Sequence, residues 1–326
     1  MIKVLITGIT GSGGSYLAEY ILNNIQSVKI VGTTRDHTPS RNINDIKDKI
    51  ELRYIDLNDA LSVYRMLEQD QPDIVFHIAS MANVRKSFDN PISVVSNNVN
   101  ITLNLLESVR LLKNKNGYNP IIQICSTSEV YGRVAAKDNP ITESCPLKPI
   151  NPYAVSKMTQ DNLGYVYYLN YGMNIIRTRM FTYLNARRGD LFATAFGRQL
   201  LEIKKGRKDK MSYGDLTSTR TIIDVREAAE AYWISTQKCK IGDVYNIGGS
   251  HPITIRSFLD DLIEKMGLSA EKVNATQDIK LLRPSDIAMQ IPDTTKFKTE
   301  TGWSPTIPYT ESLDYFIKEL YKFWDK

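Results

Sequence analysis

The most constraining feature of this sequence is a glycine-rich turn close to its first residue. A short apolar run, residues 4–6, leads into Gly8, Gly11 and Gly14, and an amphipathic stretch, residues 16–23, follows. Glycines at this spacing between a buried strand and a helix let the backbone approach a pyrophosphate, which the free N–H groups of the helix then attract. The turn therefore predicts a dinucleotide site; a glycine-rich turn without a ligand is the alternative.

Strand and helix patterns alternate after this turn. Strand-like runs occupy residues 29–33, 51–57, 73–80 and 121–125, and helical patterns occupy residues 61–67 and 97–113. This alternation predicts an α/β fold with a Rossmann-like, doubly wound parallel sheet. Residues 1–180 plus about 215–250 are expected to form the dinucleotide-binding domain. Residues about 181–214 plus 251–326 are expected to form a smaller, discontinuous C-terminal substrate-binding lobe.

Composition excludes several classes of protein. The net charge is +5 without a long Lys/Arg run, which argues against a nucleic-acid partner. No apolar run approaches the roughly 20 residues that span a bilayer, so no membrane partner is expected. Three widely spaced cysteines and the absence of a leading signal peptide fit a cytoplasmic protein. No Cys, His or Asp cluster has metal-ligand spacing, so no metal is expected.

The end of the second strand distinguishes between the two dinucleotides. Arg35 follows this strand, and an arginine suits the additional 2′-phosphate of NADP. Thr34 and Arg41 are candidates for the same pocket. Asp36 lies one residue later than the acid that usually binds the ribose of NAD, so NAD remains possible. Asp56, at the end of the third strand, is expected to contact the adenine.

The stretch from residue 121 to residue 157 contains most of the proton-handling groups. The strand 121–125 runs into a polar cluster that includes Thr127 and Glu129, and a helix is expected to start near Tyr153. Tyr153 and Lys157 are four residues apart and share one helix face. An ammonium beside a phenol is expected to lower the phenol pKa from about 10. His77 lies inside an apolar strand, which favours a packed, hydrogen-bonded core residue.

The glycine motif, Thr127 and the Tyr153-x-x-x-Lys157 pair together resemble the extended short-chain dehydrogenase/reductase family, and the likeness covers nearly the whole chain. Segments 7–19, 126–132, 187–190 and 283–286 are most similar to GDP-mannose 4,6-dehydratases. Segment 242–246 is also similar to the related GDP-4-keto-6-deoxymannose reductases. The cofactor contacts expected from the motifs and the resemblance are Gly8, Thr10, Gly11, Ser12, Gly13, Gly14, Arg35, Asp56, Leu57, Ala79, Ser80, Tyr153 and Lys157.

The resemblance implies an NADP-dependent nucleotide-sugar 4,6-dehydratase, which gives a 4-keto-6-deoxy sugar by hydride transfer and loss of water. Tyr153 would take the proton of the sugar 4-hydroxyl, supported by Lys157 and Thr127, and Glu129 would remove the proton on carbon 5. Glu129 could instead be a turn or capping acid. The alternatives are an NADPH-dependent 4-keto-sugar reductase, a 4-epimerase or decarboxylase, or a non-catalytic NADP-binding protein.

The second half is expected to bind the nucleotide sugar, with GDP-mannose or a related GDP-sugar favoured. Relatives carry an asparagine where this chain has Thr182, and a lysine near Phe196, where the nearest cation is Arg198. By resemblance, the loop of Arg187 and Arg188 reaches a neighbouring subunit's cofactor, and helices 97–113 and 153–170 join a homodimer or homotetramer. The expected substrate contacts are Ser87, Thr182, Arg188, Arg198, Arg220, Arg283 and Asp286.

Overall fold

A seven-stranded parallel sheet forms the centre of the molecule, seen here in a computed structural model that describes residues 1–36 and 38–325. The strand order is β3-β2-β1-β4-β5-β6-β9. The chain steps outward from β1 to β3 and then crosses to β4, so the order reverses beside β1. A dinucleotide binds at such a reversal in open α/β sheets. The strands are β1 (Ile2–Thr7), β2 (Val28–Thr34), β3 (Glu51–Tyr54), β4 (Ile74–His77), β5 (Ile121–Thr127), β6 (Ile175–Met180) and β9 (Val244–Ile247).

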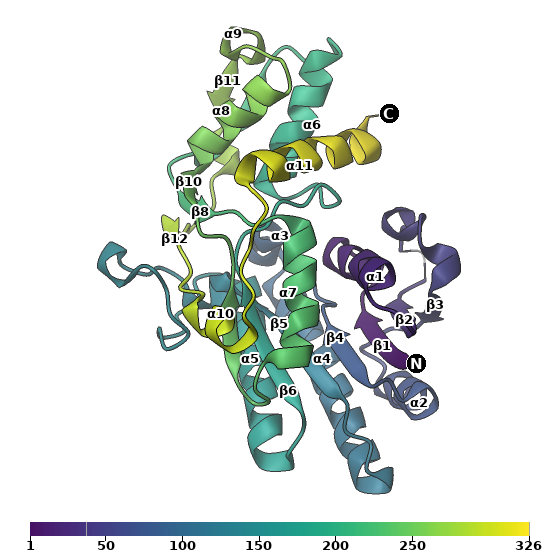
Figure 1. Ribbon diagram of the computed structural model, residues 1–326. Coiled ribbons are helices and arrows are strands. Elements are labelled where there is room, and N and C mark those ends of the chain that lie inside the picture. The colour runs from purple at the N-terminus through teal and green to yellow at the C-terminus, as the bar shows by residue number, and fades with distance from the viewer. Residues whose placement is uncertain (37, 326) are drawn as a thin grey trace.

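Helices cover both faces of this sheet, as Figure 1 shows. Alternate residues of each strand point to opposite faces, so Val4 and Ile6 pack with α1 (Ser12–Asn24) and α7 (Val225–Lys238). Leu5 packs on the other face, with α2 (Ala60–Asp70), α4 (Pro91–Asn116) and α5 (Pro152–Tyr171). Burial on both faces accounts for the nearly unbroken apolar runs of these strands. The doubly wound fold expected from the sequence is confirmed.

The start of α5 is fixed by its own sequence. The Asn151 side chain accepts a hydrogen bond from the backbone N–H of Ala154 at 2.7 Å, and Pro152 occupies the first helical position. Both are strong helix-start signals, because an asparagine satisfies a free N–H group and proline lacks one. The helix ends at Gly172, which adopts φ +58°. These signals put Tyr153 in the first turn, beside the end of β5.

A second group of elements lies above the sheet in Figure 1 and has its own core, which contains Leu200, Phe258 and Phe316. It comprises α6 (Phe192–Lys204), α8 (Ile255–Lys265), α9 (Ala270–Val273) and α11 (Tyr309–Trp324). Two small sheets join it, with strands β7 (Met211–Tyr213), β8 (Thr219–Thr221), β10 (Pro252–Thr254), β11 (Ala275–Gln277) and β12 (Met289–Gln290). Strand β8 pairs with β10 and β12, although residues 215–250 were expected to belong to the dinucleotide domain.

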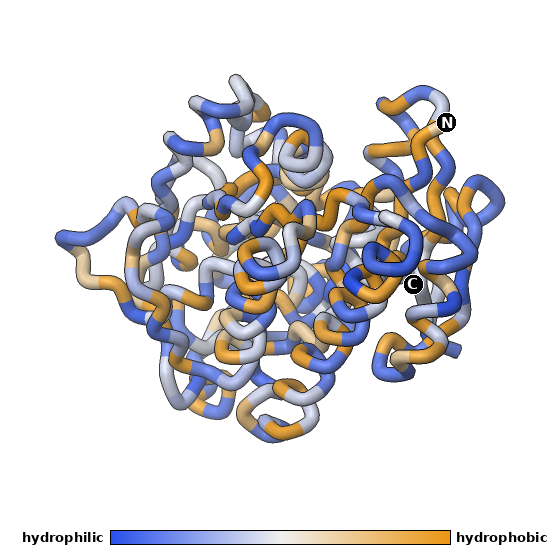
Figure 2. The backbone as a smooth tube through the Cα atoms, turned by 90° about the horizontal axis from the view of Figure 1, so that it is seen from below, coloured by the Kyte–Doolittle hydropathy of each residue, from blue (hydrophilic) through white to orange (hydrophobic). Residues whose placement is uncertain are grey.

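Short elements connect these parts. Figure 2 shows hydrophobic stretches among the packed strands and helices and hydrophilic stretches on outlying loops. The remaining elements are α3 (Val84–Asp89), α10 (Thr295–Thr301) and the 3₁₀ turns Arg41–Ile43, Lys47–Lys49, Ser128–Tyr131, Ala136–Asp138 and Ile279–Leu281. Within residues 1–36 and 38–325, no helix is long and apolar enough to cross a membrane. The same residues contain no group of three or more His, Cys, Asp or Glu side chains arranged to hold a metal.

Candidate active site

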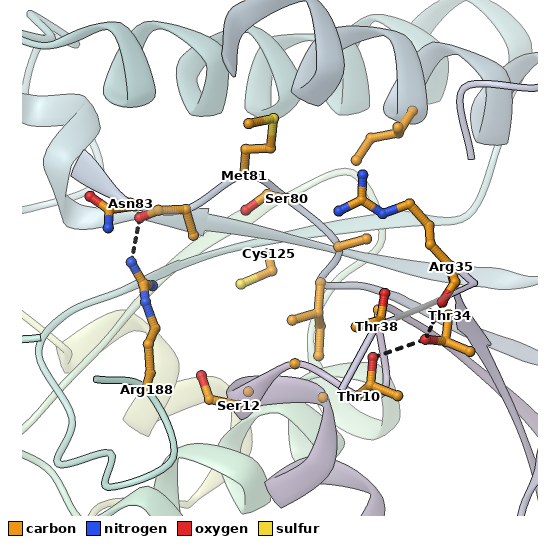
Figure 3. Close-up of a pocket in the computed structure, with 18 of the residues that line it drawn as sticks. Thr10, Ser12, Thr34, Arg35, Thr38, Ser80, Met81, Asn83, Cys125 and Arg188 are labelled. Atoms are coloured by element: carbon orange, nitrogen blue, oxygen red, sulfur yellow. Dashed lines mark hydrogen bonds between the residues drawn. The ribbon is translucent and has the colours of Figure 1, made fainter. Parts of the chain in front are cut away.

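A cleft of about 660 Å³ opens at the C-terminal ends of β1, β2 and β4. Figure 3 shows its lining, with Arg35 near one end, Arg188 near the other, and Cys125 and Ser80 between them. Every residue that the sequence predicts as a cofactor contact lines this cleft. The cleft also meets the ends of β5 and α5 through Cys125, Tyr153 and Lys157. One elongated site therefore joins the glycine turn to the proton-handling residues.

The glycine turn is packed too tightly for side chains. A Cβ atom on Gly14 would lie 2.8 Å from the carbonyl oxygen of Gly8 and 2.9 Å from the Cα atom of Ile9. Gly8 adopts φ +66°, and a Cβ atom there would lie 3.0 Å from the Cα atom of Ala79. Side chains rarely adopt that backbone conformation. The turn thus brings bare backbone and the start of α1 to the cleft, as a pyrophosphate requires.

Polar side chains line the Arg35 end of the cleft. The hydroxyls of Thr10 and Thr34 lie 3.1 Å apart, and the exposed Arg35 follows directly on β2. The side-chain amide of Asn42 donates to the carbonyl oxygen of Thr10 at 3.0 Å. Arg41 does not line the cleft, because its guanidinium stacks 4.3 Å from the ring centroid of Trp324. Of Arg35 and Arg41, Arg35 is therefore the one that this end of the cleft offers to a phosphate.

Tyr153 and Lys157 are both buried at the other end of the cleft. Burial raises the pKa of Tyr153, and the positive charge of Arg188 is the main influence in the opposite direction. Burial also lowers the pKa of Lys157, while Cys125 and Asp161 oppose this shift. The expectation that Lys157 lowers the phenol pKa is thus not met. Desolvation favours the neutral form of each group and outweighs their proximity.

Thr127 and Glu129 occupy the turn that leads out of β5. The Thr127 hydroxyl accepts a hydrogen bond from the backbone N–H of Glu129 at 3.3 Å. The side-chain amide of Asn151 donates to Oε2 of Glu129 at 2.9 Å. Asn151 also caps α5, so one side chain joins the carboxylate to the helix that carries Tyr153. The charge of Glu129 also raises the pKa of Tyr153, in the same direction as burial.

His77 has a structural environment. Its ring nitrogens lie 3.1 Å from the Thr7 hydroxyl and 2.9 Å from the Thr102 hydroxyl. Burial, aided by the charge of Lys157, lowers the pKa of His77 to about 3. The imidazole is therefore neutral at pH 7 and holds β1, β4 and α4 together, in agreement with the core position expected from the sequence.

Arg220, Arg283 and Asp286 form a second polar group. Arg220 is buried and lies 3.9 Å from Asp286, and Arg283 lies 3.7 Å from the same carboxylate. Burial lowers the pKa of Arg220, and Glu129 is the first of the acids that oppose this shift. The two arginines thus lie on the Glu129 side of the site. None of the three residues lines the cleft that contains the glycine turn.

Three other expected substrate contacts lie outside that cleft. Ser87 is fully buried, and its hydroxyl donates to the carbonyl oxygen of Val84 at 2.7 Å. Thr182 is half-buried after β6. Arg198 is exposed, with its guanidinium 4.1 Å from the ring centroid of Trp324. Arg198 thus packs against α11. To contact a substrate as predicted, its guanidinium would have to leave the Trp324 ring.

The loop after β6 puts its two arginines within their own chain. Arg187 is buried, donates to both carboxylate oxygens of Glu19 at 2.8 and 2.6 Å, and stacks 3.8 Å from the ring centroid of Tyr16. This corrects its expected role, because a side chain buried in its own chain cannot reach a neighbouring subunit. Arg188, expected at the substrate, lines the cofactor cleft and donates to the carbonyl oxygen of Ala82 at 2.6 Å.

Several cleft residues were not predicted. Tyr183 and Cys125 lie beside Tyr153, and the Cys125 sulfur is 3.0 Å from the hydroxyl of Tyr232. Asn151 is the residue whose sequence signal was readable, because an asparagine before a proline and an apolar run marks a helix start. The approach of Tyr183 and Tyr232 depends on contacts between distant segments and leaves no local pattern.

The cleft and the turn after β5 agree with what the chain resembles among known proteins. A family model described as GDP-mannose 4,6 dehydratase matches residues 5–315. The chain belongs to the GDP-mannose 4,6-dehydratase family. This confirms the resemblance found in the sequence and the assignment to nucleotide-sugar dehydratases of the short-chain dehydrogenase/reductase type.

Individual members of the GDP-mannose 4,6-dehydratase family match over nearly their whole lengths. GDP-mannose 4,6-dehydratase of Yersinia enterocolitica is 28% identical, over 95% of this chain and 91% of that protein. GDP-mannose 4,6 dehydratase 1 of Arabidopsis thaliana is 29% identical, over 97% of this chain and 88% of that protein. Among solved structures, RMD from Pseudomonas aeruginosa complexed with NADPH has a TM-score of 0.83 at 23% identity, and covers 99% of each chain. The solved structure supports the fold alone.

Proposed function

We propose that this protein is an NADP-dependent GDP-sugar 4,6-dehydratase that acts on GDP-mannose or a closely related GDP-sugar. The observation that carries the proposal is the hydrogen bond from Asn151 to Glu129. It holds a carboxylate at the end of β5, on the same site as Tyr153. Oxidation or reduction of a hydroxyl needs only the tyrosine and lysine, whereas loss of water also needs a base for the proton on carbon 5.

NADP fits the cleft through bare backbone at the glycine turn and through Arg35. Gly8 and Gly14 have no room for side chains, and Arg35 offers a fork of donors to a 2′-phosphate. The Pseudomonas aeruginosa protein, which has the same fold, is a precedent for this choice because its structure is complexed with NADPH. When bound, NADP would supply the acceptor and donor of the hydride.

The chain's own residues handle the protons. Tyr153 as phenolate accepts the proton of the sugar 4-hydroxyl, and Thr127 donates a hydrogen bond to the same oxygen. Lys157 compensates the phenolate charge. The resulting ketone acidifies the proton on carbon 5. Glu129 removes this proton and passes it to the departing 6-hydroxyl, which leaves as water. Completion of the reaction requires a hydride at carbon 6 and a solvent-derived proton at carbon 5, which gives the 4-keto-6-deoxy sugar. Because burial raises the pKa of Tyr153, substrate and cofactor have to complete the environment that stabilises its anion.

The diphosphate group of the nucleotide sugar is proposed to lie between Arg220 and Arg283. Both guanidiniums face the single carboxylate of Asp286, so two positive charges meet one negative charge. Paired arginines bind diphosphates well because each planar fork donates two hydrogen bonds. Asp286 remains the candidate for the ribose hydroxyls.

We also propose that the chain divides into two parts, a dinucleotide domain and a substrate lobe.

A homodimer through α4 and α5 accounts for apolar side chains on these adjacent helices. Leu169 is 62% exposed and Ile92 is 81% exposed. Large exposed apolar patches mark interfaces more often than solvated surface. Further exposed apolar residues of the two helices are Leu111, Val155, Tyr165, Val166 and Tyr171. All three cysteines are free thiols, which fits a cytoplasmic location.

The direct test is incubation with GDP-mannose and substoichiometric NADP. We expect a product lighter by one water, and in D₂O a product with deuterium on carbon 5, both read by mass spectrometry. Glu129→Gln should slow water loss by about 10² to 10⁴-fold and slow the incorporation of deuterium at carbon 5 to the same extent. Asp138→Asn, an exposed acid in the following loop, is the matched control and should retain the wild-type rate.

Two results would contradict the proposal. A product that forms only with stoichiometric NADPH would identify a reductase. Unimpaired water loss by Glu129→Gln would remove that residue from the reaction. The base is tested separately by thermal unfolding with GDP-, UDP- and dTDP-sugars, because a ligand stabilises the fold according to its affinity. We expect the largest shift with the GDP-sugar.

A further inference from the structure

Asp161 lies on the same face of α5 as Tyr153 and Lys157, the proposed catalytic pair. Tyr153, Lys157 and Asp161 are spaced at four-residue intervals in α5, so they follow one another along the same side of the helix. All three are buried, and Asp161 has no exposed surface. The ammonium of Lys157 thus has a buried carboxylate one helical turn away.

The Asp161 carboxylate is held by two arginines of β6. Arg177 donates from Nη1 at 3.1 Å, and Arg179 donates from Nε at 2.8 Å and from Nη2 at 3.3 Å. Burial opposes the charge on Asp161, but the two guanidiniums outweigh it, so the pKa of Asp161 lies below its usual value. The carboxylate is therefore ionised, and it fixes α5 to the strand next to β5.

The same network continues to the turn that carries Glu129. Nη1 of Arg179 lies 2.9 Å from the Tyr131 hydroxyl, which in turn donates to Oδ1 of Asn246 at 2.7 Å. Tyr131 is two residues after Glu129 in the same 3₁₀ turn and is almost fully buried. A chain of contacts therefore runs from the helix of Tyr153 and Lys157, through Asp161 and Arg179, to the turn of Glu129.

We propose that Asp161 is a positioning residue for the dehydratase: it fixes α5 against the Glu129 turn, and its charge supports the ammonium of Lys157. A contribution to stability alone does not account for a buried aspartate that is paired with two arginines. In many proteins, apolar side chains can replace a buried ion pair without loss of stability. Without its charge, the buried guanidiniums of Arg177 and Arg179 would lose the carboxylate that they share, and Lys157 would lose the acid one helical turn away. The inference rests on the proposed function for its effect on catalysis, but not for its effect on Lys157.

The charged and titratable groups that face Lys157 come from three elements. Asp161 lies on α5 and the Cys125 thiol on β5, and both favour the ammonium. His77 on β4 also feels the charge of Lys157, but its pKa of about 3 keeps it neutral near pH 7. Burial raises the pKa of Tyr153, which favours its neutral form. Asp161 is thus the carboxylate in this set.

The test combines two measurements on the full-length protein. Competitive labelling of Lys157 with acetic anhydride, read by mass spectrometry across pH, reports the pKa of its ammonium directly. The rate of water loss from GDP-mannose reports catalysis. Asp161→Asn should move the labelling midpoint to lower pH by about one unit and lower kcat by about 10²-fold, because small displacements of reacting groups are that costly. KM should change less than kcat.

Asp70→Asn is the matched control. Asp70 is also a buried aspartate held by an arginine, Arg53, through hydrogen bonds of 2.9 and 2.8 Å, but it lies at the end of α2. It should lose stability and leave the Lys157 midpoint unchanged. Asp161→Glu keeps the charge with a longer side chain, so it should keep the midpoint and still lower kcat.

An unchanged Lys157 midpoint in Asp161→Asn overturns the electrostatic part of the proposal, whatever the activity. A wild-type kcat in Asp161→Glu overturns the positioning part, and this variant serves if Asp161→Asn does not fold. Wild-type protein that releases no water, combined with a shifted midpoint in Asp161→Asn, rejects the dehydratase function and retains the electrostatic link between Asp161 and Lys157.

Discussion

The cofactor side and the substrate side of the candidate site are built from different kinds of segment. Every expected cofactor contact lines one cleft at the ends of neighbouring strands. The expected substrate contacts are divided: Arg220 and Arg283 face Asp286, Arg198 stacks on Trp324, and Ser87 is buried. Parallel strand ends are held in register by the sheet, whereas the substrate contacts come from separate helices, loops and a short strand. The difference indicates a preformed cofactor site and a substrate site that ligand completes.

The largest expected effect is on the cofactor side of the site. Gly14→Ala puts a Cβ atom 2.8 Å from the Gly8 carbonyl oxygen, so the turn has to move. We expect a loss of about 1–3 kcal/mol in the free energy of unfolding, as for other overpacked sites, and a loss of NADP affinity of about 10²-fold as the N–H groups move away. Calorimetric titration and denaturant unfolding measure these quantities.

Gly13→Ala is the control for that experiment, because a Cβ atom on Gly13 would come no closer than 3.4 Å, to the Tyr183 hydroxyl. It should retain wild-type stability. If Gly14→Ala bound NADP as the wild type does, the cofactor turn would be adaptable, and the contrast with the substrate side would fail.

A smaller effect is expected on the substrate side. Arg220→Gln removes a buried charge proposed to bind the diphosphate, and hydrogen bonds to charged groups are worth about 1.5–3 kcal/mol. The affinity for GDP should therefore fall roughly 10- to 100-fold, with NADP affinity unchanged. Arg198→Gln should leave GDP affinity within about twofold, because that guanidinium stacks on Trp324. Equal losses in both variants would mean that Arg198 leaves the ring to join the substrate.

The last effect is the smallest at neutral pH, because it concerns the stability of the sheet in acid. His77 has a pKa of about 3 in the fold, against about 6.5 in the unfolded chain. Between these values the unfolded chain binds one more proton, so this residue's contribution to stability is lost as the pH falls below about 6.5. The slope approaches about 1.4 kcal/mol per pH unit. His77→Gln should flatten urea-unfolding stability between pH 6 and pH 4, whereas the exposed His251→Gln should not.

The cofactor side of the site could be predicted from the sequence, whereas most of the substrate side could not. The glycine turn, Arg35 and the Tyr153–Lys157 spacing are local patterns whose positions a parallel sheet dictates, and they define the cleft. The positions of Arg188 and Arg198 depend on which distant segment each meets, Ala82 in one case and Trp324 in the other. The pKa of Tyr153 was expected to fall beside Lys157 and instead rises, because the sequence reveals the neighbour but not the depth of burial.

The contacts that Arg187 makes with distant segments have a consequence for when they can form during synthesis of the chain. Arg187 joins Ser15 and Glu19 at the start of α1 to Glu319 in the last helix, and Trp324 donates to the Ala186 carbonyl oxygen at 2.7 Å. The first helix is therefore supported by residues that lie about 300 positions later in the chain. A nascent chain that already contains the glycine turn lacks these supports until residues 319–324 have been translated.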